Sequence, residues 1–505
     1  MKFIKFSMIG LSLFMVSASY ATDYYVSVNG AGSKDGTSWQ NAIDFETWYN
    51  TMTDGYANGD VFHFEGGHYY VPQTIKRLAN AYTLIGGYDP ATHADPIYPT
   101  TGNAVTLIDG DRNMNGVADE GDAERCFSIQ TATSSASSPQ KPVVIRGFDF
   151  VNMYDKKGTT THGAIQLNNS HDVTIENCRF KNNTTAYSTG GMAIFNNRST
   201  IFVRDCEFVD NAAGNRGGAF YETSDNGGKG GTVFERCLFS GNKITTPISD
   251  ENKTALGSAI CYTNGPVLWI VNSTITGNES PAGGAIYATG ADATWKRIVN
   301  IVSSTIADNK GGNQINMTQG ACMHLVNSYI AGTEDEGTLA NTAIAITGAT
   351  EKTDFFEITS LGHNVIGGYV NQVENATAVP TWDATDKQGP EYTYDKIFGT
   401  NVLTDKGYIQ PVISDPGADA TTLASTIAGW DPTSARVDLT VDQTGAARKG
   451  NTTAGAYASS VATHLYGVVA PRNMEDAKTY SLGGVMVSNA TKGIFIKNGK
   501  KLLVK

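Results

Sequence analysis

Charged residues are scarce in this chain, and basic residues are the scarcer kind. Only 17% of its 505 residues are charged, with 37 Lys and Arg against 49 Asp and Glu and a formal net charge of −12. A chain this acidic is poorly suited to neutralise a nucleic-acid backbone or to sit on anionic lipid, so we expect no nucleic-acid partner. Hydrophobic residues still make up 40%, which allows a sizeable core and argues against global disorder.

Long hydrophobic runs are lacking beyond the first 21 residues. That segment, MKFIKFSMIGLSLFMVSASYA, carries two lysines, an apolar run and then small residues, which is the pattern of a removable export signal. Later stretches fall short of the ~18 consecutive apolar residues that a membrane helix needs. We therefore expect residues 1–21 to be a signal peptide and the mature chain to be a monomer that is secreted or held at the cell surface or outer membrane.

Glycine is abundant (55 residues), which suits many tight turns between short strands better than a helical protein. An eight-residue phrase also recurs, with copies that start 24 to 36 residues apart, the period range of solenoids. Its positions 1 and 3 are mostly apolar, positions 4 and 5 mostly polar or Gly, and positions 6 and 8 Cys, Ser, Phe or Ile. The copies are VVIRGFDF (143–150), VTIENCRF (173–180), IFVRDCEF (201–208), TVFERCLF (232–239), LWIVNSTI (268–275), VNIVSSTI (299–306) and MHLVNSYI (323–330).

Each phrase predicts two short strands that flank a bend. Without the bend, position 4 would share a face with positions 6 and 8 and would bury charged side chains such as Arg146 and Glu176. Asn and Asp tolerate the left-handed conformation, and they occupy the bend at Asn177, Asp205, Asn272 and Asn327. A glycine signature adds a third strand to most repeats: GMAIF (191–195), GGAFY (217–221), GSAICY (257–262) and GGAIY (283–287).

Three short strands per repeat predict the coils of an all-β parallel β-helix, in which like residues stack on like about 4.8 Å apart. One inward column should contain Ile175, Val203, Phe234 and Ile270. Another should contain Phe150, Phe180, Phe208, Phe239, Ile275, Ile306 and Ile330, and a turn column Asn183, Asn211, Asn242, Asn278 and Asn309. An antiparallel β-sandwich is the structural alternative, but it has no reason to repeat a phrase at this period.

Further phrases carry a family resemblance. They are YYVSVNGAGSKDGTSWQNA (24–42), GGAIY, NSTITGN, SLGHNVIGG (360–368) and DQTGAARKGNTTAGAY (442–457). They resemble secreted right-handed β-helix proteins of the pectate-lyase-like superfold, particularly those with polymorphic outer-membrane-protein repeats and a choice-of-anchor Q region, in patches over residues 24–460. The resemblance implies a right-handed solenoid but little about function, because this superfold hosts lyases, hydrolases, adhesins and passenger domains.

The segments that flank the repeats lose the phrase. Residues 22–105 should form an N-terminal cap and first coils, with a short helix at 44–49 that protects the open edge. Residues 106–460 should form the β-helix, with distorted coils and long loops over 370–440. Residues 461–505 end in a strand-turn-strand pattern (491–505) that resembles a type IX secretion sorting tail, and the alternative is a hairpin that closes the last coil.

The most specific chemical pattern is DRNMNGVADEGD at 111–122, which has the spacing of oxygen ligands in a calcium loop. Gly116 would permit the sharp turn, whereas Asp at the last position has a shorter reach than the usual Glu. We predict calcium as the cofactor, and the alternative is an acidic surface loop. The predicted ligands are Asp111, Asn113, Asn115, Val117 through its carbonyl, Asp119 and Asp122.

Cysteine is rare, with six residues: Cys126, Cys178, Cys206, Cys237, Cys261 and Cys322. An even number in an exported chain invites disulfides. However, three of them share phrase position 6 in consecutive repeats, where later repeats carry Ser. This predicts a column of small buried side chains in which neighbouring coils are close enough for one pair to be oxidised.

The signatures of known polysaccharide-cleaving β-helices are lacking, both the arginine-rich pattern of pectate lyases and the paired aspartates of polygalacturonases. Arg146, Arg204, His162, His171 and Asp172 are candidate groups for acid–base work, but a solvated ladder of charges explains them as well. We therefore assign no catalytic residue and expect an exported, adhesin-like interaction protein whose partner is a polysaccharide or a cell-surface glycan. The alternative is a polysaccharide lyase or glycoside hydrolase on the same scaffold.

Overall fold

The chain contains two compact units, Met1–Ser459 and Ser460–Lys505. The computed structural model describes residues 21–504 apart from 73–75, 132–140, 156–162, 186–189, 224–230, 247–255, 264, 282, 291–296, 319, 333–342, 348–356, 372–379, 414–416, 429, 431–435, 449–452, 459–478, 482–485, 488–492 and 498–499. The predicted signal peptide therefore lies outside the described residues except for its last position. Within the described part of the chain, no helix is long and apolar enough to cross a membrane.

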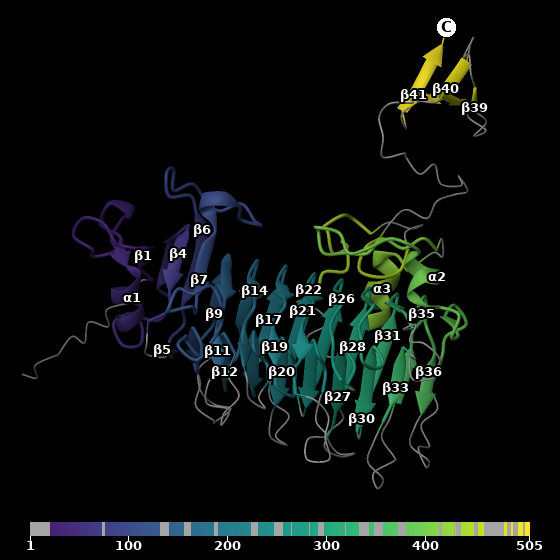
Figure 1. Cartoon of the computed structure of the whole chain (residues 1–505), viewed down its shortest axis with the longest axis horizontal. Coiled ribbons are helices and arrows are strands. Elements are labelled where there is room, and N and C mark those ends of the chain that lie inside the picture. Colours follow the sequence, from purple (N-terminus) through teal and green to yellow (C-terminus); the bar gives the residue numbers. More distant parts are fainter. Residues whose placement is uncertain are drawn as a thin grey trace, which may run out of the picture. The chain divides into compact units, whose positions relative to one another are not determined.

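Parallel sheets run along the first unit and enclose its core (Figure 1). Sheet 1 contains β1 (Asp23–Ser27), β2 (Ile43–Asp44), β3 (Val61–Glu65), β6 (Thr83–Tyr88), β9 (Val143–Arg146), β13 (Val173–Glu176), β17 (Thr200–Arg204), β21 (Gly231–Glu235), β25 (Val267–Val271), β28 (Arg297–Val302), β31 (Ala321–Val326) and β34 (Glu357–Ser360). Sheet 2 contains β4 (Gly67–Tyr70), β7 (Thr106–Asp109), β10 (Phe148–Val151), β14 (Arg179–Lys181), β18 (Glu207–Val209), β22 (Leu238–Ser240), β26 (Thr274–Thr276), β29 (Thr305–Ala307), β32 (Tyr329–Ile330), β35 (Val365–Ile366) and β37 (Lys387–Gln388).

Sheet 3 closes each coil, and a short sheet lies between sheets 2 and 3 in the middle coils. Sheet 3 contains β5 (Lys76–Leu78), β8 (Phe127–Ile129), β12 (Ile165–Asn168), β16 (Ile194–Asn197), β20 (Phe220–Thr223), β24 (Ile260–Thr263), β27 (Ile286–Thr289), β30 (Ile315–Thr318), β33 (Ile344–Ile346) and β36 (Tyr369–Asn371). The short sheet contains β11 (Tyr154–Asp155), β15 (Thr184–Thr185), β19 (Ala212–Ala213) and β23 (Lys243–Ile244). Each strand pairs in parallel with its equivalent in the next coil, which confirms the predicted all-β parallel β-helix.

The predicted columns are present inside the coils. The rings of Phe180 and Phe208 stack with centroids 5.1 Å apart, and Phe208 stacks on Phe239 at 4.4 Å. The column continues through isoleucines in the later coils. On sheet 1, Ile175 and Val203 are paired neighbours, and the same inward column continues to the predicted positions in β21 and β25. Like-on-like packing therefore forms the core.

A buried asparagine ladder marks the turn after sheet 2. The side-chain amide of Asn211 donates to the Asn242 side-chain oxygen at 3.0 Å, and Asn242 donates to Asn278 at 2.8 Å. Asn183 precedes these residues in the ladder, and Asn309 ends it with a 2.6 Å bond to Gln314. The same oxygens accept backbone N–H groups, so the ladder satisfies polar atoms that the turn would otherwise leave buried without partners.

The bend between sheets 1 and 2 takes the left-handed conformation that the sequence predicts. Asn177, Asp205 and Asn272 have φ values of 50°, 51° and 49°. The next phrase position holds the cysteine column, and all six cysteines of the chain are buried. The Cys178 backbone N–H donates to Cys206 Sγ at 3.4 Å, so the small side chains stack from coil to coil as expected.

A helix covers the first coils. Helix α1 (Phe45–Thr51) begins after Asp44, whose carboxylate accepts the Thr47 backbone N–H as an N-cap. Its buried face contains Trp48 and Tyr49, and the Tyr49 hydroxyl donates to the Cys126 carbonyl at 2.6 Å. The short helix predicted at 44–49 is confirmed, displaced by one residue at its start.

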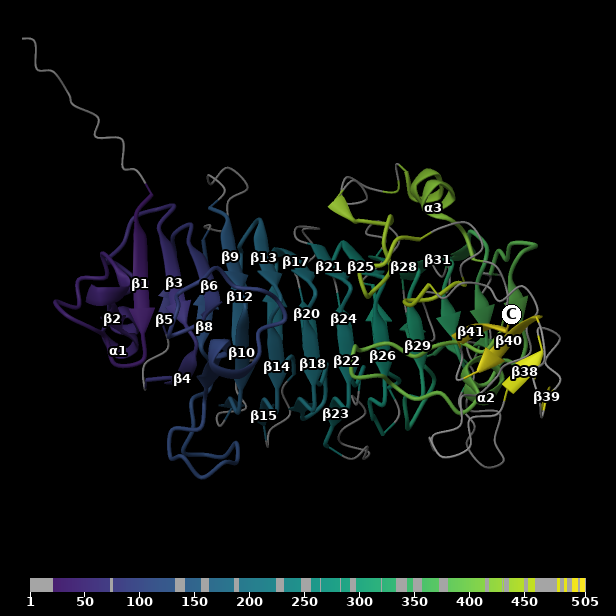
Figure 2. The same ribbon diagram turned by 90° about the horizontal axis from the view of Figure 1, so that it is seen from above.

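The C-terminal part of the first unit departs from the predicted distorted coils. After β37 and helix α2 (Tyr394–Phe398), the described residues of 399–458, here called the strap, run back along the outside of earlier coils and include helix α3 (Ala420–Ile427) (Figure 2). The physical reason lies in sheet 1, where outward side chains such as Phe202, Val233 and Trp269 are apolar and need a cover. The strap buries them under Ala418, Leu423, Ile427 and Leu439.

The second unit is a small antiparallel sheet in its described residues. It contains β38 (Thr479–Ser481), β39 (Met486–Val487), β40 (Gly493–Lys497) and β41 (Lys500–Val504). Strands β40 and β41 form the hairpin that the strand-turn-strand pattern predicts, with Lys497 paired to Lys500. The role of this unit in secretion remains a prediction.

Candidate functional site

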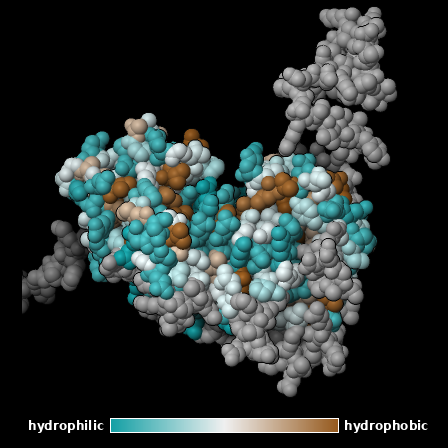
Figure 3. Space-filling model, viewed as in Figure 1, coloured by the Kyte–Doolittle hydropathy of each residue, from teal (hydrophilic) through white to brown (hydrophobic). Residues whose placement is uncertain are grey.

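A polar groove of about 300 Å³ lies between two raised parts of the first unit (Figure 3). Its floor comes from consecutive coils at the bend and on the outer side of sheet 2, and its two ends are closed by the loop at 89–105 and by the strap. The lining residues are Tyr98, Pro99, Thr100, Asp149, Asn177, Cys178, Arg179, Asp205, Cys206, Glu207, Arg236, Leu238, Lys406, Gly407, Gln443, Thr444 and Gly445. We call this space the groove.

The N-terminal wall depends on a glycine in the coil beneath it. Tyr98 donates its hydroxyl to the Gly86 carbonyl at 2.7 Å. Its ring lies directly over Gly147, where a Cβ atom would overlap both the ring and the Gly86 carbonyl oxygen. The backbone of Gly147 also has a φ of 78°, in the left-handed region. Only glycine at this bend lets the wall rest on the coil.

Replacing Gly147 with alanine is expected to displace the wall. Overpacking costs about 1–3 kcal/mol in addition to the conformational strain. We therefore expect Gly147→Ala to lose more stability than a glycine replacement that causes strain alone, and to show faster hydrogen exchange in residues 89–105. Gly277→Ala is the matched control, because Gly277 has a φ of 65° but its added Cβ would meet nothing closer than 3.8 Å. Equal losses of stability and unchanged exchange in both variants would contradict this account of the wall.

Gln443 ties the strap wall to the coils at the edge of the groove. The Gln443 side-chain oxygen accepts the Thr274 hydroxyl at 2.6 Å. Its amide donates to the Gly407 carbonyl at 2.9 Å and to the Cys237 carbonyl at 3.3 Å. Two separate stretches of the strap are thereby held at one edge of the groove.

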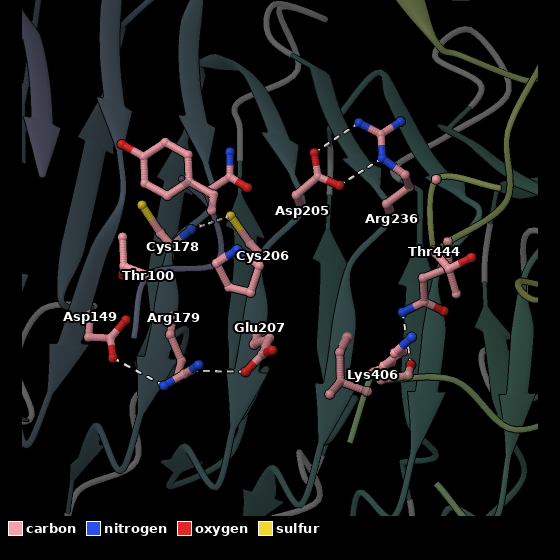
Figure 4. A pocket seen from close by; sticks show the side chains of 17 residues that line it. Thr100, Asp149, Cys178, Arg179, Asp205, Cys206, Glu207, Arg236, Lys406 and Thr444 are labelled. Atoms are coloured by element: carbon pink, nitrogen blue, oxygen red, sulfur yellow. Dashed lines mark hydrogen bonds and ion pairs between the residues drawn. The ribbon is translucent and has the colours of Figure 1, made fainter. Parts of the chain in front are cut away.

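A chain of ion pairs forms the sheet 2 side of the floor (Figure 4). Asp149, Arg179 and Glu207 occupy the same register position in three consecutive coils. The Arg179 guanidinium lies 3.2 Å from Asp149 and 2.9 Å from Glu207. Burial raises the pKa of Asp149 above its ordinary value, although Arg179 opposes that rise. Burial works against the charge of Arg179, but its two carboxylate neighbours raise its pKa overall.

A second set of ion pairs lies at the bend. Arg236 makes two contacts with Asp205, at 2.7 and 2.9 Å, and a further contact with Glu235 at 3.1 Å. Hydrogen bonding to Asp205 raises the pKa of Arg236, so its charge is permanent. Glu235 is 1% exposed, and burial raises the pKa of its carboxyl group. The floor therefore contains fixed charges of both signs.

A further depression of about 400 Å³ adjoins the groove across the bend and shares Arg236 with it. We call it the side arm. One side consists of Arg204, Glu235 and Arg236 from the coils, and the other of Arg436, Val437 and Asp438 from the strap. The Asp438 backbone N–H donates to Glu235 at 2.7 Å, which fixes the strap against the coil at this point.

Three of the candidate acid–base residues from the sequence belong to one network, in which Glu176 lies between Arg146 and Arg204, and Arg436 of the strap links Arg204 to Asp172. Arg146 pairs with Glu176 at 2.6 Å. Arg204 lies 2.9 Å from Glu235, and Asp172 lies 3.3 Å from Arg436 of the strap. His162 lies outside the described residues. Three of the five candidates are therefore partners in ion pairs, either between coils or between a coil and the strap.

Sequence reasoning missed the residues that line the groove. Asp149, Arg179 and Glu207 all stand at phrase position 7, and Asp205 and Arg236 stand at position 5. The available signal was the alternation of negative and positive residues at position 7 in three consecutive copies, because opposite charges on neighbouring parallel strands pair. That signal predicts an ion-pair ladder but gives no indication of the walls beside it.

The predicted calcium loop folds as a series of tight turns about its own side chains. Asp111 accepts the backbone N–H groups of Asn115 and Gly116 at 3.1 and 2.6 Å, and Gly116 has a φ of 81°. The Asn113 and Asn115 side-chain oxygens accept backbone N–H groups at 3.0 and 2.8 Å. The amides of the same two asparagines donate to Asp119.

The acidic groups of this loop influence one another. Burial raises the pKa of Asp122, and Asp119 and Asp111 add to the rise. Oxygen ligands with two or more mutually repelling carboxylates suit a hard cation. However, within the described ranges no three His, Cys, Asp or Glu side chains are grouped as metal ligands. Calcium at residues 111–122 therefore remains a prediction.

One family model agrees with this architecture. The family model for a right handed beta helix region matches residues 141–294. The first unit of the chain is a right-handed parallel β-helix. Among solved structures, a glycoside hydrolase shares 11% identity with a TM-score of 0.40, over 74% of this chain and 97% of that one. A complex of XylC with xylose shares 10% identity with a TM-score of 0.40, over 86% of this chain and 98% of that one. No curated protein matches the chain.

Proposed function

We propose that this β-helix is an exported interaction protein that binds a glycan in the groove. The observation that supports the proposal is a walled groove floored by ion pairs between coils, as in Asp149–Arg179–Glu207 and Asp205–Arg236. Sugar hydroxyls both donate and accept hydrogen bonds, and charged partners make the stronger bonds. Because neighbouring coils hold these groups in place, little conformational freedom is lost when a ligand binds.

Binding is favoured over catalysis by the pairing of the carboxylates. A glycoside hydrolase needs one protonated and one ionised carboxyl group. Here the Arg236 guanidinium lies within 2.9 Å of Asp205 and the Arg179 guanidinium within 2.9 Å of Glu207, so both carboxyl groups are already engaged in ion pairs. A carboxyl group held in this way can accept hydrogen bonds from sugar hydroxyls through its outer lone pairs, whereas a general acid needs a free path to the leaving group.

Removing one of these carboxylates is expected to weaken glycan binding. Glu207→Gln deprives Arg179 of a charged partner and alters the sugar-facing floor, so we expect at least a tenfold loss of affinity for an oligosaccharide that the wild type binds. Glu279→Gln is the matched control, since Glu279 also pairs across coils, with Lys243 at 3.5 Å, but does not line the groove. Isothermal titration measures both. Equal affinities of wild type and Glu207→Gln would argue against binding at this place.

One observation favours a second candidate, a glycoside hydrolase. Asp149 is the groove carboxyl whose pKa burial raises, and Glu207 lies two coils away. Two coils correspond to about 9.6 Å, at the wide end of the carboxyl separations of inverting enzymes. Incubation with polysaccharides should then release reducing ends that disappear in Asp149→Asn. We expect no release, because Arg179 stands between the two carboxyls.

We also propose that residues 111–122 bind calcium. Binding to the folded state alone stabilises it by about 2.7 kcal/mol at a hundredfold excess over Kd, which should raise the melting temperature. Asp111→Ala should abolish that increase, because Asp111 supplies the first ligand and holds the turn at Gly116. Glu120→Gln in the same loop is the control at a non-ligand position. Superimposable melting curves of the wild type in calcium and in chelator would rule the site out.

A further inference from the structure

We infer that the bound glycan is uncharged and that it crosses the coils, passing from the groove over the bend into the side arm. This inference rests on the proposed glycan binding and specifies the ligand class and its path. It follows from the balance of charge around the two depressions and from the position of the walls.

Acidic and basic groups are equal in number around the combined surface. The five carboxylates are Asp149, Asp205, Glu207, Glu235 and Asp438, and the five cations are Arg179, Arg204, Arg236, Lys406 and Arg436. This balance is notable because the whole chain has a net charge of −12. A uronate polymer would bring one carboxylate per residue to a surface without surplus positive charge.

The arginines of this surface are already engaged. Arg179 contacts two carboxylates, and Arg236 contacts Asp205 and Glu235. Arg436 pairs with Asp172 at 3.3 Å and lies over the Phe202 ring, 3.2 Å from its centroid. A ligand carboxylate that paired with one of these arginines would have to break an existing pair and leave a protein carboxylate partly buried and without its partner, which is costly. A neutral sugar can hydrogen-bond to the outer lone pairs and N–H groups while every pair stays intact.

The walls determine the direction in which the bound glycan runs. Along the stack of coils the groove ends at the loop that contains Thr100 on one side and at Lys406 and Thr444 of the strap on the other (Figure 4). Across the stack it continues past Arg236 into the side arm, where Arg436, Val437 and Asp438 form the far border. This second direction joins the two polar depressions, so an extended ligand that fills both lies roughly parallel to the strands.

The test compares neutral cello- and manno-oligosaccharides with oligogalacturonates of the same length by isothermal titration at two salt concentrations. We expect one of the neutral series to bind, galacturonates to bind at least tenfold more weakly, and the neutral affinity to change less than twofold with salt. Asp205→Asn removes one of the two carboxylate partners of Arg236 and adds one net positive charge, so it should make the difference in affinity between the neutral series and the galacturonates smaller than tenfold. Wild-type preference for galacturonates would overturn the inference and leave glycan binding intact, whereas binding of neither series would contradict the proposed function itself.

The path is tested separately with a variant of the side arm. In the wild type we expect affinity to increase with chain length until both depressions are filled. Val437→Trp places a large side chain in the side arm and should reduce the affinity of a hexasaccharide about tenfold, to that of a shorter oligomer. If Val437→Trp keeps the wild-type melting temperature and its affinity still increases with oligosaccharide length as in the wild type, the oligosaccharide takes another path.

Discussion

The free energy of unfolding is expected to fall as the pH rises from about 4.5 to about 8, and replacing Glu222 with glutamine is expected to remove most of that fall. Glu222 points into the core from β20 and is 0% exposed. Burial raises the pKa of its carboxyl group to about 8, although hydrogen bonds from Thr232 and Asn196 and the charge of Arg297 oppose the rise. Among the residues that the structure describes, its second oxygen has no hydrogen-bond partner.

Stability decreases with rising pH because the pKa of Glu222 is higher in the folded state than in the unfolded state. The folded state holds the Glu222 proton more tightly than the unfolded state, so the stabilisation is complete below pH 4.5 and is lost as the pH rises through about 8. The shift corresponds to roughly 5 kcal/mol over the window. Glutamine preserves shape and hydrogen bonding but has no charge to develop.

Denaturant unfolding at pH 5, 6.5 and 8 measures this effect. Glu391→Gln, at an exposed glutamate, is the control and should follow the wild-type curve. The contrary result is that the free energy of unfolding of Glu222→Gln falls between pH 5 and 8 as steeply as that of the wild type. In that case the carboxyl group is ionised in the folded protein at a lower pH than its burial implies.

Replacing Arg448 with alanine is expected to detach the strap from the coils. The Arg448 guanidinium is buried and donates to the Asn272 side-chain oxygen at 2.9 Å and to the Gly455 carbonyl at 2.7 Å. Burial lowers its pKa to about 10, while Asp442 opposes the change, so the group remains charged at neutral pH. Removing one partner from a buried charged network typically costs about 3–5 kcal/mol.

Hydrogen exchange over residues 436–457 should therefore accelerate strongly in Arg448→Ala, while the strand signal in circular dichroism is retained. Because Gln443, Thr444 and Gly445 form one wall of the groove, glycan affinity should fall at least tenfold at the same time. Arg77→Ala, at an exposed position on β5, should change neither quantity. Wild-type protection of the strap in Arg448→Ala would show that its apolar contacts alone hold it in place.

The coils could be predicted because their contacts repeat with the sequence. Phe180, Phe208 and Phe239 stand at one phrase position, and each packs on the residue one period away. The same holds for the asparagine ladder and for the left-handed bend at Asn177 and Asp205. Parallel pairing converts a period along the chain directly into contact between neighbouring residues in space.

The strap and the groove could not be predicted in this way. Arg448 reaches Asn272 across 176 positions, and Gln443 reaches Thr274 across 169, so neither contact leaves a periodic trace. A weaker signal was present at phrase position 2, where apolar residues such as Phe202 and Trp269 replace the polar side chains that an exposed sheet would carry. This pattern indicates that a cover exists without identifying the segment that provides it.

The number of coils between the two walls determines the length of the groove. The Tyr98 wall rests on the coil that contains β6, and the Gln443 wall is fastened to the coils of β22 and β26. Duplication or deletion of one whole repeat between them would preserve every register and every rung of the asparagine ladder. The distance between the walls would nevertheless change by one step of about 4.8 Å. Duplication of a repeat would therefore change the length of ligand that the groove accommodates in steps of one coil, while the sequence of each loop stays the same.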